Sequence, residues 1–208
     1  MRPKPPSRAA TIGYRLVTVF LVFAVASAAY AIASLVVGLA RDGDSLLYGD
    51  ALTVPLQLSP DNASPLPAGV HFSGWPDVSV DVEDPTSKQM LLRSAQDFGS
   101  LALLIAGLWL LRGFARAVKD GDPFGVSNVG RLRGLGFLLV AGAPLVELLN
   151  WSLRQSLYNA LPPTPSVDIG VAGFSLPAAA LLGGFGAFIL AEVFAYGLRL
   201  REDVEGTV

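Results

Sequence analysis

The sequence lacks cysteine entirely and contains a single histidine, His71. Without cysteine there is no disulfide, no thiol nucleophile and no cysteine-bound metal, and one histidine cannot supply a multi-histidine site. Charged residues are also scarce, at 15% of the chain, and no long basic patch interleaved with aromatic residues is present. These absences argue against an enzyme, and they predict no cofactor, no metal site and no direct binding of nucleic acid.

Apolar residues, in contrast, make up 52% of the chain and are gathered into four long runs. Runs of this length are typical of helices that cross a bilayer. The sequence therefore predicts an α-helical membrane protein with four transmembrane helices, whose first partner is the lipid bilayer. The predicted spans are residues 15–40, 95–118, 134–153 and 176–198. Pro144 lies inside the third span and predicts a kink there, because proline removes a backbone donor and crowds the preceding turn.

The first run also allows a second interpretation, a cleaved signal peptide. "MRPKPPSR" is a basic leader, and "ASAAYA" offers small residues suited to cleavage. Apolar residues continue for about ten positions beyond that site, which a signal peptide does not need. An uncleaved transmembrane helix is the favoured interpretation.

Lysine and arginine are distributed unequally on the two sides of these spans. Eleven of the fifteen flank one side and four flank the other, and the richer side is expected to be cytoplasmic. This predicts a multi-pass membrane protein with both termini in the cytoplasm. The predicted cytoplasmic segments are 1–14, 119–133 and 199–208, and the predicted outer segments are 41–94 and 154–175.

The outer segments contain apolar residues at alternate positions, a period that predicts half-buried strands. We expect a small β-rich extracytoplasmic cap, with Pro55 keeping its strand at an edge or in a bulge. A ligand-sensing role for His71, Phe72 and Trp75 is one hypothesis, and a lid that merely folds is the favoured one. The alternating positions are Leu52, Val54, Leu56 and Leu58, then Val78, Val80 and Val82, and finally Val167, Ile169 and Val171.

Two acids, Glu147 and Glu192, lie within the predicted third and fourth spans. An ionisable group inside a membrane is costly and is by default a functional hypothesis. Asn150 follows Glu147 at i+3, and Tyr196 follows Glu192 at i+4, so each acid begins a polar line on one helix face. We expect these faces to contact other helices, with Arg112 or Arg116 as the partner of Glu192. The two acids are expected at different depths, which disfavours a paired-carboxylate site.

The fourth predicted span also carries small residues at every fourth position, namely Gly183, Ala187, Ala191 and Ala195. Such spacing lets two helix backbones approach closely, and it predicts packing rather than activity.

The stretch "GDPFGVSNVGRLR" separates the second and third spans. Gly121 and Pro123 predict a turn, and Ser127 is predicted to cap the helix that carries Asn128 onward. Together with the C-terminal tail, this stretch is hypothesised to form a composite cytoplasmic docking surface. The alternative is simple basic anchoring with frayed ends. The hypothesised docking residues are Phe124, Asn128, Arg131, Arg133, Arg201, Glu202 and Val208.

The blocks "DPF…SN…RLRGLG" and "AEVFAYGLRLREDVEGTV" resemble a bacterial membrane family catalogued as domain of unknown function 2975. The resemblance implies a four-helix protein of the bacterial inner membrane without an established activity. Members of this family are often encoded beside a small helix-turn-helix regulator of the Cro/CI type. The matching residues are Pro123, Phe124, Asn128, Arg131 and Leu132, then Glu192, Phe194, Gly197, Leu200, Arg201, Glu202, Gly206, Thr207 and Val208.

The resulting functional hypothesis is a non-enzymatic regulatory or sensory partner of a cytoplasmic helix-turn-helix regulator. The alternative is a small ion-coupled transporter or carrier that uses Glu147 or Glu192.

Overall fold

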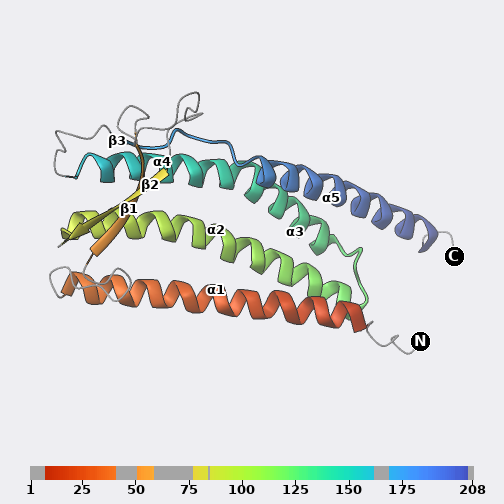
Figure 1. Cartoon of the computed structure of the whole chain (residues 1–208). Coiled ribbons are helices and arrows are strands. Elements are labelled where there is room, and N and C mark those ends of the chain that lie inside the picture. Colours follow the sequence, from red (N-terminus) through yellow and green to blue (C-terminus); the bar gives the residue numbers. More distant parts are fainter. Residues whose placement is uncertain (1–7, 41–50, 59–76, 84, 162–168, 206–208) are drawn as a thin grey trace, which may run out of the picture. The chain divides into compact units, whose positions relative to one another are not determined.

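The computed structural model describes residues 8–40, 51–58, 77–83, 85–161 and 169–205 (Figure 1). His71, Phe72 and Trp75, which the ligand-sensing hypothesis singled out, lie outside the described residues. Val167 and Val208 also lie outside them.

Four helices are long and apolar enough to cross a membrane, as the sequence predicted. They are α1 (Arg8–Ala40), α2 (Ser87–Asp120), a third helix that begins as α3 (Val126–Phe137) and continues as α4 (Ala143–Tyr158), and α5 (Ala178–Glu205). Large apolar side chains on them are open to the surroundings: Phe23 is 71% exposed, Trp109 66% and Leu182 73%. Exposed apolar faces of this extent suit contact with lipid rather than with water.

The third helix contains a π-helical turn, η2 (Leu138–Gly142), directly before Ala143 and Pro144. The backbone N–H of Ala143 donates to the carbonyl of Leu138, five residues earlier. The prolyl ring would collide with the carbonyl of Val140 in a regular α-helix. The predicted disturbance at Pro144 is therefore accommodated by a widened turn in the residues before it.

The chain divides into two compact units. The first, here called the helical unit, comprises the described residues up to 28, then 100–147 and 176–205. The second, here called the sheet unit, comprises the described parts of 29–99 and 148–175.

In the sheet unit, strands β1 (Ala51–Leu58), β2 (Asp77–Glu83) and β3 (Ile169–Gly170) form an antiparallel sheet in the order β2-β1-β3. The predicted alternation is confirmed: Leu52, Val54 and Leu56 are buried, and the residues between them are exposed. This apolar face packs against Leu157 of α4 and Leu92 of α2, so the sheet lies beside the end of α4 and the start of α2 (Figure 1).

Pro55 was expected to keep its strand at an edge of the sheet or in a bulge, and the structure meets this expectation only in the immediate surroundings of Pro55. β1 is the middle strand of the sheet, not an edge strand. However, β3 is only two residues long and pairs with Gln57 and Leu58, whereas Pro55 lies opposite Ser79 of β2. The shortness of β3 lets a strand that contains proline occupy the middle of the sheet.

Within the helical unit, α5 packs closely on α3 and η2 through small residues. A Cβ atom at Gly184 would lie 2.6 Å from Cγ2 of Val140 and 3.0 Å from the carbonyl oxygen of Gly136. Gly184 is buried with Ala187 and Ala191, whereas Gly183 is exposed. The prediction is confirmed at Ala187 and Ala191, but the close-packed face begins at Gly184 and not at the predicted Gly183.

Candidate functional site

The loop between α2 and α3 is a tight turn built around Gly121. Gly121 has a φ of 89°, a left-handed conformation that glycine adopts without steric cost. The backbone N–H of Asp122 donates to the carbonyl of Ala117, and this bond ends α2. The turn predicted from Gly121 and Pro123 is thus present in the structure.

The start of α3 differs from the prediction. Gly125 occupies the N-cap position with extended backbone, no side-chain cap is made, and Ser127 lies inside the helix. The backbone N–H of Asn128 donates to the carbonyl of Gly125 at 2.8 Å. The N-cap of α3 is Gly125, two residues before the predicted Ser127. The side chain of Asn128, and not a capping serine, stabilises the loop at this point.

Asn128 is completely buried and holds the loop from within. Its Nδ2 donates to the carbonyls of Asp122 at 3.1 Å and Pro123 at 3.0 Å. Its Oδ1 accepts a 2.8 Å bond from Arg131 Nη1, which also donates to the carbonyl of Gly113 in α2 at 3.0 Å. Asn128 is thus placed in the interior rather than on the expected docking surface, and together with Arg131 it fixes the loop against α2.

Phe124 occupies the outer side of the same loop. Its ring centroid lies 5.0 Å from that of Phe194 in α5, and a Cβ atom at Gly197 would lie 3.1 Å from two carbons of the Phe124 ring. Despite these contacts the side chain is 41% exposed. Phe124 is therefore an apolar group held in a defined position at the surface.

The C-terminal end of α5 and the loop meet through a charge pair. Arg201 of α5 donates to Oδ1 of Asp122 at 3.4 Å, with both side chains more than half exposed. We call the exposed residues Asp122, Phe124, Val126 and Arg201 the loop patch.

Glu192 was expected to pair with Arg112 or Arg116, and this expectation is wrong. Its carboxylate accepts a 2.8 Å bond from Arg133 of α3, and Arg116 pairs with Asp120 one turn along α2. Because residues on a helix turn about 100° each, Gly197 and Arg201 lie roughly 140° and 180° around α5 from Glu192. Of the hypothesised docking residues, Phe124 and Arg201 thus lie in the loop patch, whereas Arg133 pairs with Glu192 on a different side of α5.

The other polar residues singled out in the sequence lie outside the loop patch. Glu147 and Asn150 are half-buried in α4, and each is engaged in a further interaction. Tyr196 is 63% exposed on α5, on the side of the helix that carries Glu192. Glu202 lies in the described helix α5, but its surroundings lie outside the described residues.

The sequence did not predict a polar contact between α1 and α2, which Arg112 makes with Tyr14 and Thr18. Arg112 donates to the hydroxyl of Tyr14 at 3.0 Å and to Thr18 Oγ1 at 3.2 Å, both in α1. Lys119 also lies over the Tyr14 ring, with its Nζ 5.0 Å from the centroid. The seven-residue spacing of Arg112 and Lys119 places them on one helix face, but nothing in the sequence showed that Tyr14 would lie opposite.

The four apolar helices and their exposed faces define a multi-pass membrane protein. Over residues 94–208, more than half of its length, the chain matches the family described as protein of unknown function (DUF2975), and it belongs to that family. The match begins at Ser94 within α2 and continues through α5, and so includes the loop patch. No curated protein and no solved structure matches the chain.

Proposed function

We propose that this protein is a non-enzymatic regulatory partner of a cytoplasmic protein, and that the loop patch is its docking surface. The proposed orientation places both termini and the loop patch in the cytoplasm. It rests on the eleven of fifteen basic residues that flank this side of the spans. In this orientation the sheet formed by β1, β2 and β3 lies outside the cell as a small cap.

The observation that carries the proposal is the construction of the loop. An exposed phenylalanine is held by Phe194 and Gly197, and the backbone behind it is fixed by the buried Asn128. A surface that is already ordered loses little conformational entropy on binding. Aromatic and arginine side chains are also the groups that most often dominate protein interfaces, and the loop patch offers one of each.

The proposed partner is a small helix-turn-helix regulator, the type of protein that the family resemblance places beside such membrane proteins. A DNA-binding domain has a strongly basic face for phosphate contacts. The neutral Asp122–Arg201 pair and the apolar Phe124 would suit a different, mixed face of the regulator. Docking there would let the membrane protein hold or release the regulator.

The ion-carrier alternative is less well supported by the geometry. A carrier needs a carboxylate that exchanges its partner during transport. Glu192 is held by Arg133 at 2.8 Å, and Glu147 is engaged as well. We therefore favour docking over ion coupling.

Negative charge introduced into the loop patch tests the proposal. The double variant Val126→Asp, Arg201→Glu is expected to weaken co-purification with the neighbouring helix-turn-helix regulator by about ten-fold or more, because the loss of an interface hot spot costs about 2 kcal/mol or more. The matched control is Arg199→Glu, which reverses the charge of an exposed arginine two residues from Arg201. That variant is expected to retain binding.

Binding that stays undiminished in the double variant, and also after deletion of residues 199–208, would contradict the docking function. Equal loss in the Arg199→Glu control would show that net charge, and not the loop patch, governs the association.

A further inference from the structure

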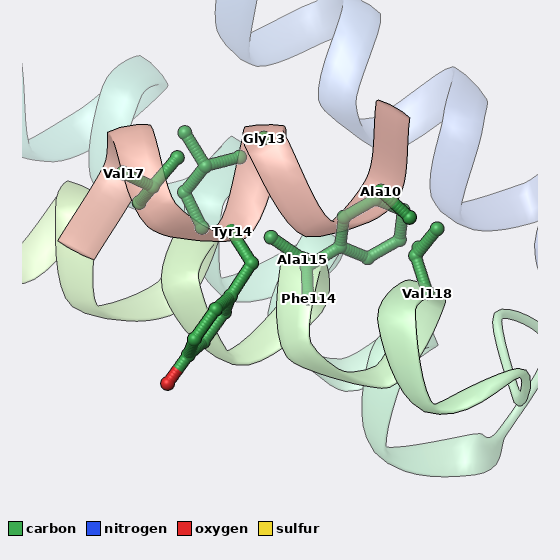
Figure 2. Close-up of a pocket in the computed structure, with 8 residues that line it drawn as sticks. Ala10, Gly13, Tyr14, Val17, Phe114, Ala115 and Val118 are labelled. Atoms are coloured by element: carbon green, nitrogen blue, oxygen red, sulfur yellow. The ribbon is translucent and has the colours of Figure 1, made fainter. Parts of the chain in front are cut away.

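An apolar hollow lies between α1 and α2 within the helical unit (Figure 2). Its volume is about 260 Å³, and four residues from each helix line it. Gly13 and Tyr14 contribute from α1, and Phe114 and Val118 contribute from α2. A Cβ atom at Gly13 would meet nothing within 4 Å, so the absent side chain helps to leave this space open.

Two cations lie over the ring of Tyr14, which is one of the residues that line the hollow. The guanidinium carbon of Arg112 lies 5.4 Å from the ring centroid, and Nζ of Lys119 lies 5.0 Å from it. Arg112 is further fixed by its bonds to the Tyr14 hydroxyl and to Thr18. Cation–π attraction and these hydrogen bonds orient the two groups without neutralising either charge.

Neither cation has a carboxylate partner among the residues that the structure describes. Other basic residues of α2 and α3 do have one: Arg116 pairs with Asp120, and Arg133 pairs with Glu192. Two like charges that share one aromatic ring repel each other, and the repulsion is stronger beside an apolar, poorly hydrated surface. An anion placed between or beside them would relieve this cost.

We infer that this site binds an anionic phospholipid, with the phosphate at Arg112 and Lys119 and one acyl chain in the hollow. Both cations lie in the last turns of α2, near its end at Asp120, where a membrane helix passes from the hydrocarbon to the headgroup region. Basic pockets between transmembrane helices are known binding places for anionic headgroups. Two cations that have no carboxylate partner among the described residues, together with a nearby apolar space, favour a lipid over a soluble phosphate.

The test uses the full-length protein in mild detergent and measures binding of phosphatidylglycerol by native mass spectrometry, with phosphatidylcholine as the neutral lipid. The double variant Arg112→Gln, Lys119→Gln is expected to lose about thirty-fold in affinity for phosphatidylglycerol, since each basic residue near anionic lipid contributes roughly five-fold. Binding of phosphatidylcholine is expected to change little.

A matched control removes the same charge elsewhere. Arg116→Gln, Arg199→Gln has the same net charge as the test variant, but Arg116 is already paired with Asp120, and Arg199 lies on α5. It is expected to retain phosphatidylglycerol binding. Equal loss in both double variants would contradict a specific site and would show general charge attraction only.

Two further arms separate the lipid from other phosphates. Gly13→Leu fills the hollow and is expected to weaken lipid binding while the cations remain. Inorganic phosphate at millimolar concentration is expected to compete poorly. Full competition by inorganic phosphate, together with an unaffected Gly13→Leu variant, would overturn the lipid assignment in favour of a free-phosphate site. If the double variant does not fold, Lys119→Gln alone provides the test, because the hydrogen bonds of Arg112 to α1 stay intact; unchanged affinity there would contradict the site.

Discussion

Replacing Asn128 with alanine is expected to destabilise the protein by about 2–3 kcal/mol, because buried polar groups would lose their partners. The carbonyls of Asp122 and Pro123 would each lose the donor that Asn128 provides, and Arg131 would lose an acceptor. Asn128 is fully buried, so water cannot readily replace these bonds. Unfolding by sodium dodecyl sulfate in mixed micelles would measure the change in the free energy of unfolding.

Ser127→Ala is the matched control for this prediction. Ser127 is the neighbouring residue, it is exposed, and it does not cap α3. Its replacement is expected to change the free energy of unfolding by less than about 0.5 kcal/mol, as for most surface substitutions. If Asn128→Ala proved as harmless as Ser127→Ala, the buried network could not be what holds the loop in place.

Replacing Gly184 with alanine is expected to destabilise the packing of α5 on the third helix by about 1–3 kcal/mol, the usual cost of overpacking. The added methyl group would lie 2.6 Å from Val140 Cγ2 and 3.0 Å from the carbonyl oxygen of Gly136. The valine side chain is branched and stiff, and the carbonyl belongs to a helix backbone, so neither can yield cheaply. The two helices would have to separate. Thermal unfolding in detergent would measure the effect.

Gly186 provides the control for that substitution on the same helix. A Cβ atom there would meet nothing within 4 Å. Gly186→Ala is therefore expected to be neutral, or to stabilise the helix by up to about 1 kcal/mol through the better helix propensity of alanine. Similar melting temperatures for the two variants would be incompatible with the close contact at Gly184.

The sequence was most informative where a single periodic pattern decides the structure. Four apolar runs were sufficient to predict four membrane helices, and alternation at Leu52, Val54 and Leu56 was sufficient to predict a strand with one buried face. Both patterns depend on burial along one element only. They do not require knowledge of which other element lies opposite.

The partners of charged side chains could not be predicted in the same way. Glu192 pairs with Arg133 and not with Arg112, because the choice depends on the rotation of α3 and α5 about their axes. Adjacent positions on a helix differ by about 100°, so a small error in rotation changes the partner. The same uncertainty concealed the meeting of Tyr14 with Arg112 and Lys119.

The sequence also contains a local signal for the start of the second helix. The second helix begins at Ser87, well before the predicted residue 95. Thr86 and Gln89 form a reciprocal capping box: the N–H of Thr86 donates to Gln89 Oε1 at 2.8 Å, and the N–H of Gln89 donates to Thr86 Oγ1 at 3.4 Å. The stretch "TSKQ" has the spacing of that motif. Hydropathy alone predicted where the membrane span begins, but it did not predict that the helix itself begins earlier, at Ser87.

The central claim is that the loop patch faces the cytoplasm while strands β1 and β2 face outward. Because the chain has no cysteine, single cysteines at Ser127 and Ser79 can be labelled selectively with a membrane-impermeant maleimide. Both positions are exposed, one at the start of α3 and one in β2. In intact spheroplasts we expect labelling of the Ser79→Cys protein, with Ser127→Cys labelled only after the membrane is permeabilised. Labelling of Ser127→Cys in intact spheroplasts would contradict the proposed topology and, with it, the docking function.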